Sequence, residues 1–207
     1  MSRVPPYEVR QDEHGIGSVL IPNGPWSAEC TLRMKVGDIF ALRLSHSAGF
    51  RGQDLSFLEE FPALRSIEVY STNIRSLEPL RHLGAIEVLG LQTQAVTKIC
   101  SLDFPALRVA LVQWRRGMDE LLSVTTLEHL NVINYPHANL DALAKLHDLK
   151  RLAITSRKLI SLTGIESLTE LVELDLYSCP NLLSVEPARD RSPHIKIEVE
   201  SCRHIRK

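Results

Sequence analysis

The sequence predicts an α/β solenoid in which short coils stack in a row, and three observations predict it. Strand-like segments recur about every 22 residues, which is the period of a repeat protein. Within each segment, apolar and polar residues alternate, as in a strand with one buried face. Each segment is followed by apolar residues at every third position, the step of a short 3₁₀ turn with one inward face. Because one coil cannot bury its own leucines, neighbouring coils must stack.

The composition fits such an array and argues against several classes of protein. The 207 residues are 44% hydrophobic and only 5% aromatic, so the core must be aliphatic. Lys and Arg number 24 against 25 Asp and Glu, and this balance lacks the basic excess of a nucleic-acid-binding protein. No apolar run approaches the roughly 18 residues of a transmembrane helix, and the polar start lacks the apolar stretch of a signal peptide. We therefore expect neither a nucleic-acid nor a membrane partner.

Residues 1–37 do not fit the repeat and are expected to form an N-terminal cap, because the first coil would otherwise expose its leucines. The stretch GSVLI in this segment has the pattern of a strand. Ser27 is placed to cap a short helix that runs to about Val36 and ends at Gly37. Trp26 is expected to cover the first coil.

Residues 38–193 carry the repeats, and residues 194–207 are expected to form a truncated coil that closes the array. Position one of the successive coils falls at Ile39, Leu64, Ile86, Leu107, Leu127, Leu149, Leu171 and His194. The coil around Ala110 fits less cleanly, and a slip of one residue there would exchange its inward and outward side chains. The apolar residues of the return segment are clearest at Leu77, Leu80 and Leu83.

The run LKRLAITSRKLISLTGIESLTELVELDLYSC resembles leucine-rich repeat proteins, in particular their short internalin-like class with a repeat of about 22 residues. The L-x-x-L-x-L strand and the L-x-x-[LI]-x-x-L return carry the resemblance, which extends over residues 39–205. It implies a right-handed, horseshoe-shaped solenoid. Its concave side would be a parallel sheet of about 7–8 strands, with short 3₁₀ or helical segments on the convex side.

The resemblance also implies a ladder of Asn or Cys side chains at position nine, where each side chain bonds the backbone of neighbouring coils. The chain departs from this pattern, because position nine holds Ser47, Thr72, Gln94, Arg115, Tyr135, Arg157, Cys179 and Cys202. Only the two cysteines match, so a continuous ladder is not expected. Cys179 and Cys202 are one period apart and should stack, either as buried thiols or as a disulfide.

No motif of an enzyme or a metal site is present. The chain lacks GxSxG, HExxH, Walker A and paired CxxC patterns, and HGIGS lacks the third glycine of a dinucleotide-binding loop. His129 and His137 are too far apart, in strand and loop, to favour a metal. We therefore expect no enzyme activity, cofactor or bound metal. The alternatives are an enzyme whose site joins the cap to the first coils through His14, His46 or Cys30, and a recognition fragment of a larger adaptor.

The remaining candidate site is the open, concave face of the predicted sheet, where positions three, five, seven and eight are expected to point outward. Aromatic side chains there are typical of residues that dominate binding energy. The last coils place like charges on neighbouring strands, which costs stability and favours the attraction of a basic partner. The expected partner-binding residues are Tyr70, Gln92, Trp114, Ile133, Glu173, Asp175, Tyr177, Glu198 and Glu200.

The sequence thus predicts a non-catalytic protein–protein interaction module that binds a partner protein on its concave face. By its fold it resembles adaptors, inhibitors and the immunity proteins that neutralise bacterial toxins, and the acidic end points to a basic toxin as the target. We expect a cytoplasmic protein, because its four cysteines form no paired motif and should stay reduced there.

Overall fold

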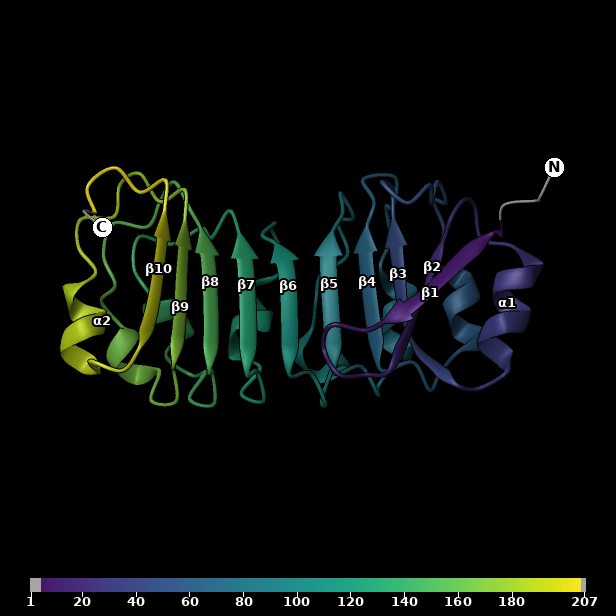
Figure 1. The fold of residues 1–207 in the computed structure, drawn as a ribbon, viewed down its shortest axis with the longest axis horizontal. Helices are drawn as coiled ribbons and strands as arrows, with labels where there is room; N and C mark the ends of the chain where they lie inside the picture. Colours follow the sequence, from purple (N-terminus) through teal and green to yellow (C-terminus); the bar gives the residue numbers. More distant parts are fainter. Residues whose placement is uncertain (1–4, 206–207) are drawn as a thin grey trace. The chain divides into compact units, whose positions relative to one another are not determined.

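A computed structural model describes residues 5–205, and the chain divides into two compact units, Met1–Leu107 and Arg108–Lys207. In the first unit a β-hairpin leads into parallel strands, in chain order (Figure 1): β1 Tyr7–Gln11, β2 Ser18–Pro22, β3 Ile39–Ser45, β4 Ser66–Tyr70 and β5 Val88–Gln92. All strands of the second unit are parallel: β6 Val109–Gln113, β7 His129–Ile133, β8 Arg151–Thr155, β9 Glu173–Tyr177 and β10 Lys196–Glu200.

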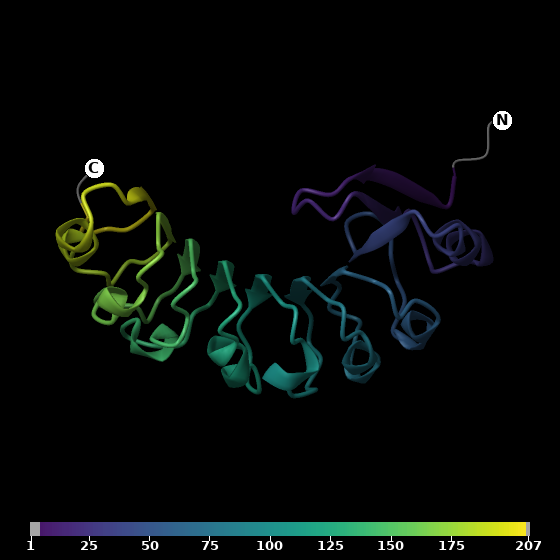
Figure 2. The same ribbon diagram turned by 90° about the horizontal axis from the view of Figure 1, so that it is seen from below.

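Short return segments follow the strands, and within each unit they lie on one side of them (Figure 2). In the first unit they are η1 Ser56–Glu60, η2 Glu78–His82 and η3 Ser101–Asp103, all 3₁₀ helices. In the second unit they are η4 Asp119–Ser123, η5 Asp141–Leu143, η6 Ile165–Ser167 and the α-helix α2 Glu186–Arg191. The predicted architecture of parallel strands and short returns is therefore confirmed.

The hydrophobic core of each unit lies between the strands and their returns. In β9, Leu174 and Leu176 are fully buried, and so is Leu168 in the preceding return. Asp175 and Tyr177 alternate with the two leucines of the strand and are only half-buried, so the two-residue period separates a dry face from a wetter one. β3 to β10 make eight repeat strands among the described residues, which agrees with the expected number.

The coil around Ala110 keeps the register of its neighbours in the second unit. Ala110 pairs with Leu130 and Gln113 pairs with Ile133, with no bulge between β6 and β7. Ala110 and Val112 are consequently buried, at 0% and 1% exposure. The one-residue slip that the irregular spacing left open does not occur.

The N-terminal helix α1 (Ala28–Lys35) forms where its capping residues predict it. The Ser27 hydroxyl accepts a hydrogen bond from the Cys30 amide at 3.3 Å, and Gly37 ends the helix with a φ of 87°. Trp26 stacks on Phe57 of η1, with ring centroids 4.1 Å apart, and so covers the first coil as expected. The boundaries of the cap and of the closing coil stay a prediction, and their residues 1–4 and 206–207 lie outside the described part of the chain.

The turn after each strand decides which side chain enters the core. Asn134, Ser178 and Ser201, at position eight, have left-handed backbones with φ of 63°, 51° and 57°. In each of these turns the next residue points inward, and the inward residues are Tyr135, Cys179 and Cys202. Ser71 and Ser156 lack the left-handed backbone and are themselves buried, each 1% exposed. The prediction that position eight points outward is therefore wrong at these two serines.

In both kinds of turn the inward side chain forms hydrogen bonds with backbone atoms, as the expected ladder residue would. The Ser156 hydroxyl donates to the Tyr135 carbonyl of the preceding coil at 2.7 Å and accepts from the amides of Lys158 and Leu159, both at 3.0 Å. Cys179 and Cys202 are free thiols, and the Cys179 amide donates to Cys202 Sγ at 3.3 Å. Burial raises the pKa of Cys179 to about 11, so its thiol remains protonated. Side chains at the turns therefore connect the coils as in the expected ladder, but the connecting residue is at position eight in some coils and at position nine in others.

The ladder predicts the cost of removing one hydroxyl. Ser156→Ala leaves the buried Tyr135 carbonyl, the buried Leu159 amide and the part-buried Lys158 amide without this partner, and should lower the free energy of unfolding by about 1–3 kcal/mol. Ser178→Ala removes an exposed hydroxyl from the next coil and should cost about 0.5 kcal/mol or less. Urea denaturation of both variants measures the difference, and equal losses would contradict the ladder.

Candidate functional site

The open face of a unit is the face of its strands opposite the return segments, and in the first unit this face is largely closed. The sheet curls so that β1 and the loop joining it to β2 lie on the open side of β3 and β4 (Figures 1 and 2). At position three, Ala41, Ser66 and Val88 are fully buried, and at position five Glu68 is 1% exposed. The prediction that positions three and five point into solvent is therefore wrong for these residues.

An ion pair between the partly buried Arg43 and the buried Glu68 lies on the first unit's open face. Arg43 Nη2 lies 2.9 Å from Glu68 Oε1, and Arg43 Nη1 lies 3.5 Å from Glu13 Oε1 in the hairpin loop. The Tyr70 hydroxyl donates to Glu68 Oε2 at 2.6 Å. Burial, and then the neighbouring carboxylate of Glu68, raise the pKa of Tyr70, so the hydroxyl keeps the proton that it donates. Gln92, beside Tyr70 on β5, is half-buried. The hydroxyl of Tyr70 is thus already committed within the unit.

Gly90 creates the space for this cluster. It is paired with Glu68 on the neighbouring strand, and both hold position five. A Cβ atom at Gly90 would lie 2.7 Å from Tyr70 Oη and 2.8 Å from Glu68 Cγ, closer than real Cβ contacts allow. The absent side chain lets Tyr70 and Glu68 lie flat across β5.

Substituting this glycine should therefore break the cluster. We expect Gly90→Ala to lower the free energy of unfolding by about 1–3 kcal/mol, because the methyl group overpacks a buried site. Gly84→Ala, at a turn with no atom within 4 Å of the new methyl group, should stay within about 0.5 kcal/mol of the wild type. Thermal and urea denaturation compare the two variants, and a Gly90→Ala protein as stable as the Gly84→Ala protein would show that the space is not needed.

The open face of the second unit is more accessible and has a neutral centre. Position seven places Gln113, Ile133, Thr155 and Tyr177 side by side on β6 to β9, and all four are at least partly exposed. Trp114 lies just beyond this row, because its amide donates to the Ile133 carbonyl at 2.7 Å. Its ring meets His137 edge-on at a centroid distance of 6.1 Å. Trp114 thus belongs to an aromatic group at the end of the strands.

The acidic end of this face is smaller than the sequence indicates. Asp175 pairs with Glu198, and Tyr177 with Glu200, as the equal positions predict. Glu173, however, lies between two cations at position three, 2.5 Å from Lys196 Nζ and 3.1 Å from Arg151 Nε. The hydrogen bond from Lys196, with the charge of Arg151, lowers the pKa of Glu173. The carboxylates that remain without such compensation are Asp175, Glu198 and Glu200.

Asp175 has the least favourable electrostatic surroundings of these three carboxylates. Burial raises the pKa of Asp175, and the charges of Glu173 and Glu198 raise it further. Its buried Oδ1 atom has no hydrogen-bond partner among the described residues. Ionised Asp175 therefore destabilises the folded chain, a cost that a cationic ligand would relieve.

The raised pKa of Asp175 predicts a stability effect that depends on pH. Asp175→Asn should raise the melting temperature near neutral pH, where the wild-type carboxylate is charged in both the folded and the unfolded chain. The gain should shrink as the pH falls through the raised folded pKa and vanish below the ordinary value, because both states of the wild type are then protonated. Melting curves between about pH 3 and pH 7 test this. Asp148→Asn, at an exposed turn, serves as the control, and a gain independent of pH would contradict the assignment.

One residue of the enzyme alternative, Cys30, is inaccessible in the structure. Cys30 is fully buried in α1, and its Sγ accepts a hydrogen bond from the Ser27 hydroxyl. Within residues 5–205 no three His, Cys, Asp or Glu side chains gather in a way that would hold a metal ion. The same part of the chain contains no helix with the length and apolar character needed to cross a bilayer.

Stacked coils of one strand and one short return, with buried leucines on one face, define the leucine-rich repeat fold. Among solved structures, the chain is similar to internalin C2 from Listeria monocytogenes, with 19% identity and a TM-score of 0.67 over 87% of this chain and 80% of that one. It also matches internalin F from the same organism, at 15% identity and a TM-score of 0.48, over 80% of this chain and 61% of that one. No family model and no curated protein sequence matches the chain. The chain has an internalin-like leucine-rich repeat fold.

Proposed function

We propose that the chain is a non-catalytic module that binds a partner protein with the open face of its second unit. The observation that carries this proposal is the accessible row Ile133, Thr155 and Tyr177 beside the uncompensated carboxylates of Asp175 and Glu198. Repeat proteins use extended sheet faces of this kind to bind other proteins. A tyrosine at the border between neutral and charged surface is typical of residues that dominate binding energy.

The charges favour a basic partner. Glu198 and Glu200 have no cation within ion-pair distance among the described residues, and both are exposed. An uncompensated field of one sign raises the rate at which an oppositely charged partner associates. Pairing with a cation would also offset the repulsion between Asp175 and Glu198. Glu173 contributes less, because Lys196 and Arg151 already neutralise it.

Within this proposal, an inhibitor or immunity protein that neutralises a basic toxin is the specific role that we favour. A small array with one acidic face suits a target whose active surface is positively charged. All four cysteines are unpaired, which fits a protein that acts in the reducing cytoplasm.

Neutralising the acidic residues tests the electrostatic part of the proposal. The triple variant Asp175→Asn, Glu198→Gln, Glu200→Gln should associate with the partner about tenfold more slowly at low salt, and its rate should depend less on salt. The partner is first captured with the wild-type chain from cells that contain it, and its association rate is then measured by surface plasmon resonance.

A matched triple variant provides the control for this experiment. Asp148→Asn, Glu170→Gln, Asp190→Asn removes the same charge from exposed positions of the second unit outside the strands, and should leave the rate within about twofold of the wild type. Equal rates for the wild type and the open-face triple variant would remove the acidic residues from the proposal.

A further inference from the structure

A groove with a volume of about 620 Å³ lies at the end of the second unit, where β8, β9 and β10 lead into their turns. Its walls come from three successive turns of the array, and it lies beyond the strand ends rather than on the open face. The lining residues are Arg157, Ser178, Pro180, Ser201, Cys202 and Arg203.

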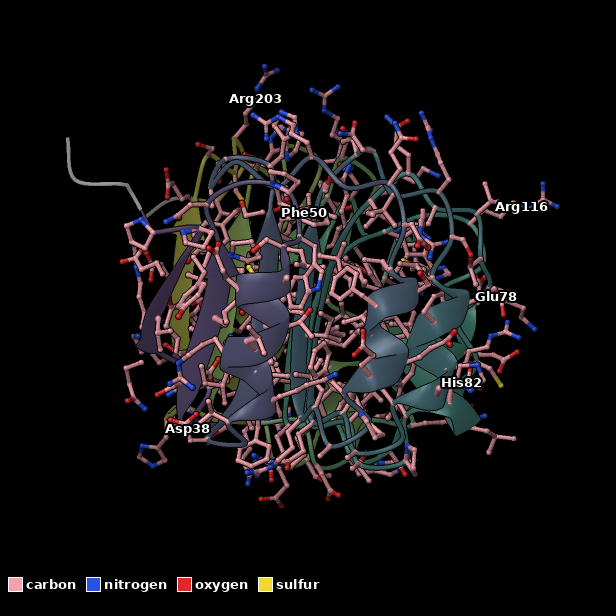
Figure 3. All side chains as sticks on the ribbon, turned by 90° about the vertical axis from the view of Figure 1, so that its right-hand side faces the viewer. Asp38, Phe50, Glu78, His82, Arg116 and Arg203 are labelled. Atoms are coloured by element: carbon pink, nitrogen blue, oxygen red, sulfur yellow. The ribbon has the colours of Figure 1, made fainter. Side chains whose placement is uncertain are left out.

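The groove carries a local positive charge on a chain that is nearly neutral as a whole. Its three turns read SRKLI, SCPNL and SCRHI and contain no acidic residue. Arg157 and Arg203 have no carboxylate within ion-pair distance among the described residues, whereas Arg151 and Lys196 on the nearby strands are both paired with Glu173. Figure 3 shows the Arg203 side chain pointing away from the ribbon. Both guanidinium groups are therefore available to a ligand.

The change of the inward residue between positions eight and nine explains why the side chains of Arg157, Ser178 and Ser201 reach the groove. Because Ser156 points inward, Arg157 at position nine is exposed. In the next two turns the left-handed backbones of Ser178 and Ser201 turn the following cysteines inward and leave the serine hydroxyls exposed. The turn thus supplies donors to the groove in each of three coils.

The last described coil adds a backbone donor. The Ser178 amide donates to the Glu200 carbonyl of the following coil at 2.9 Å. The Ser201 amide holds the same position in the last described coil, and no acceptor for it is found within residues 5–205. Guanidinium groups, hydroxyls and an amide together form a set of donors that suits the oxygens of an anionic group.

We propose that this groove binds an acidic segment of a partner protein, with side-chain carboxylates held by Arg157 and Arg203. The volume accommodates several side chains, and Pro180 adds an apolar part to the lining. A segment that brings only a few carboxylates suits this groove better than a continuous phosphate backbone, because two arginines line the groove and Glu198 and Glu200 on the adjacent strand repel any further negative charge. The site differs in place and in sign from the acidic open face, and it does not depend on the function proposed for that face.

Binding of a fluorescein-labelled hexaglutamate peptide to the full chain, followed by fluorescence anisotropy, tests the proposal. The double variant Arg157→Gln, Arg203→Gln should weaken binding about tenfold or more, because both charge-assisted contacts are lost. The matched double variant Arg116→Gln, Lys145→Gln removes the same charge from exposed positions elsewhere in the second unit and should stay within about twofold of the wild type. Melting temperatures confirm that both variants are folded.

The proposal would be overturned by a lack of binding by the wild type, by equal weakening in both double variants, or by tighter binding of oligodeoxythymidine that is lost in the Arg157, Arg203 variant. The last outcome would assign the groove to nucleic acid. The open-face triple variant should bind the peptide at least as tightly as the wild type, because it removes nearby repulsion. Peptide binding lost in that variant would place the peptide on the open face and would also overturn the proposal.

Discussion

The stacking of coils is the constraint on which the rest of the structure depends, because no coil can bury its own leucines. Leu174 and Leu176 are dry only because neighbouring coils and the return segments cover them. Stacking in turn fixes the register, so that residues at one position of successive coils, such as Asp175 and Glu198, must become neighbours whatever their charge. Polar contacts between coils form within this register, and the hydrogen bond from the buried Ser156 hydroxyl to the preceding coil is one of them. The open faces, with their attractive and repulsive pairs, follow from the same alignment.

The periodicity of the sequence predicts this alignment well because apolar residues recur at the buried positions, and the burial of apolar side chains stabilises the fold most. The alternation through β9 places Leu174 inside and Tyr177 outside, and the side-by-side placement of Asp175 and Glu198 follows from the repeat length alone. Position eight is less predictable, because its direction depends on backbone φ rather than on residue type. Ser156 and Ser178 have the same chemistry, yet one is buried and the other is exposed through a left-handed backbone.

The candidate site was harder to predict, because it depends on contacts between different parts of the sequence. Arg151 and Lys196 compensate Glu173, and all three residues hold position three of successive coils, so the repeat spacing alone predicts that the two cations flank the carboxylate. The repeat spacing does not predict that the open face of the first unit is covered. This covering depends on how the sheet curls and on the contact between Glu13 and Arg43, neither of which a repeat pattern encodes. The groove at Arg157 depends on the change of the inward residue between positions eight and nine, which becomes visible only with the backbone angles.

The ion pair beneath Tyr70 gives the two units unequal freedom to change. In the first unit, Arg43, Glu68 and Gly90 fit one another so closely that a new side chain on the open face would disturb folding before it altered specificity. In the second unit, Ile133 and Thr155 are partly exposed on strands whose cores lie on the other side. Substitutions on the open face, by natural drift or by protein engineering, should therefore cost less stability in the second unit than in the first.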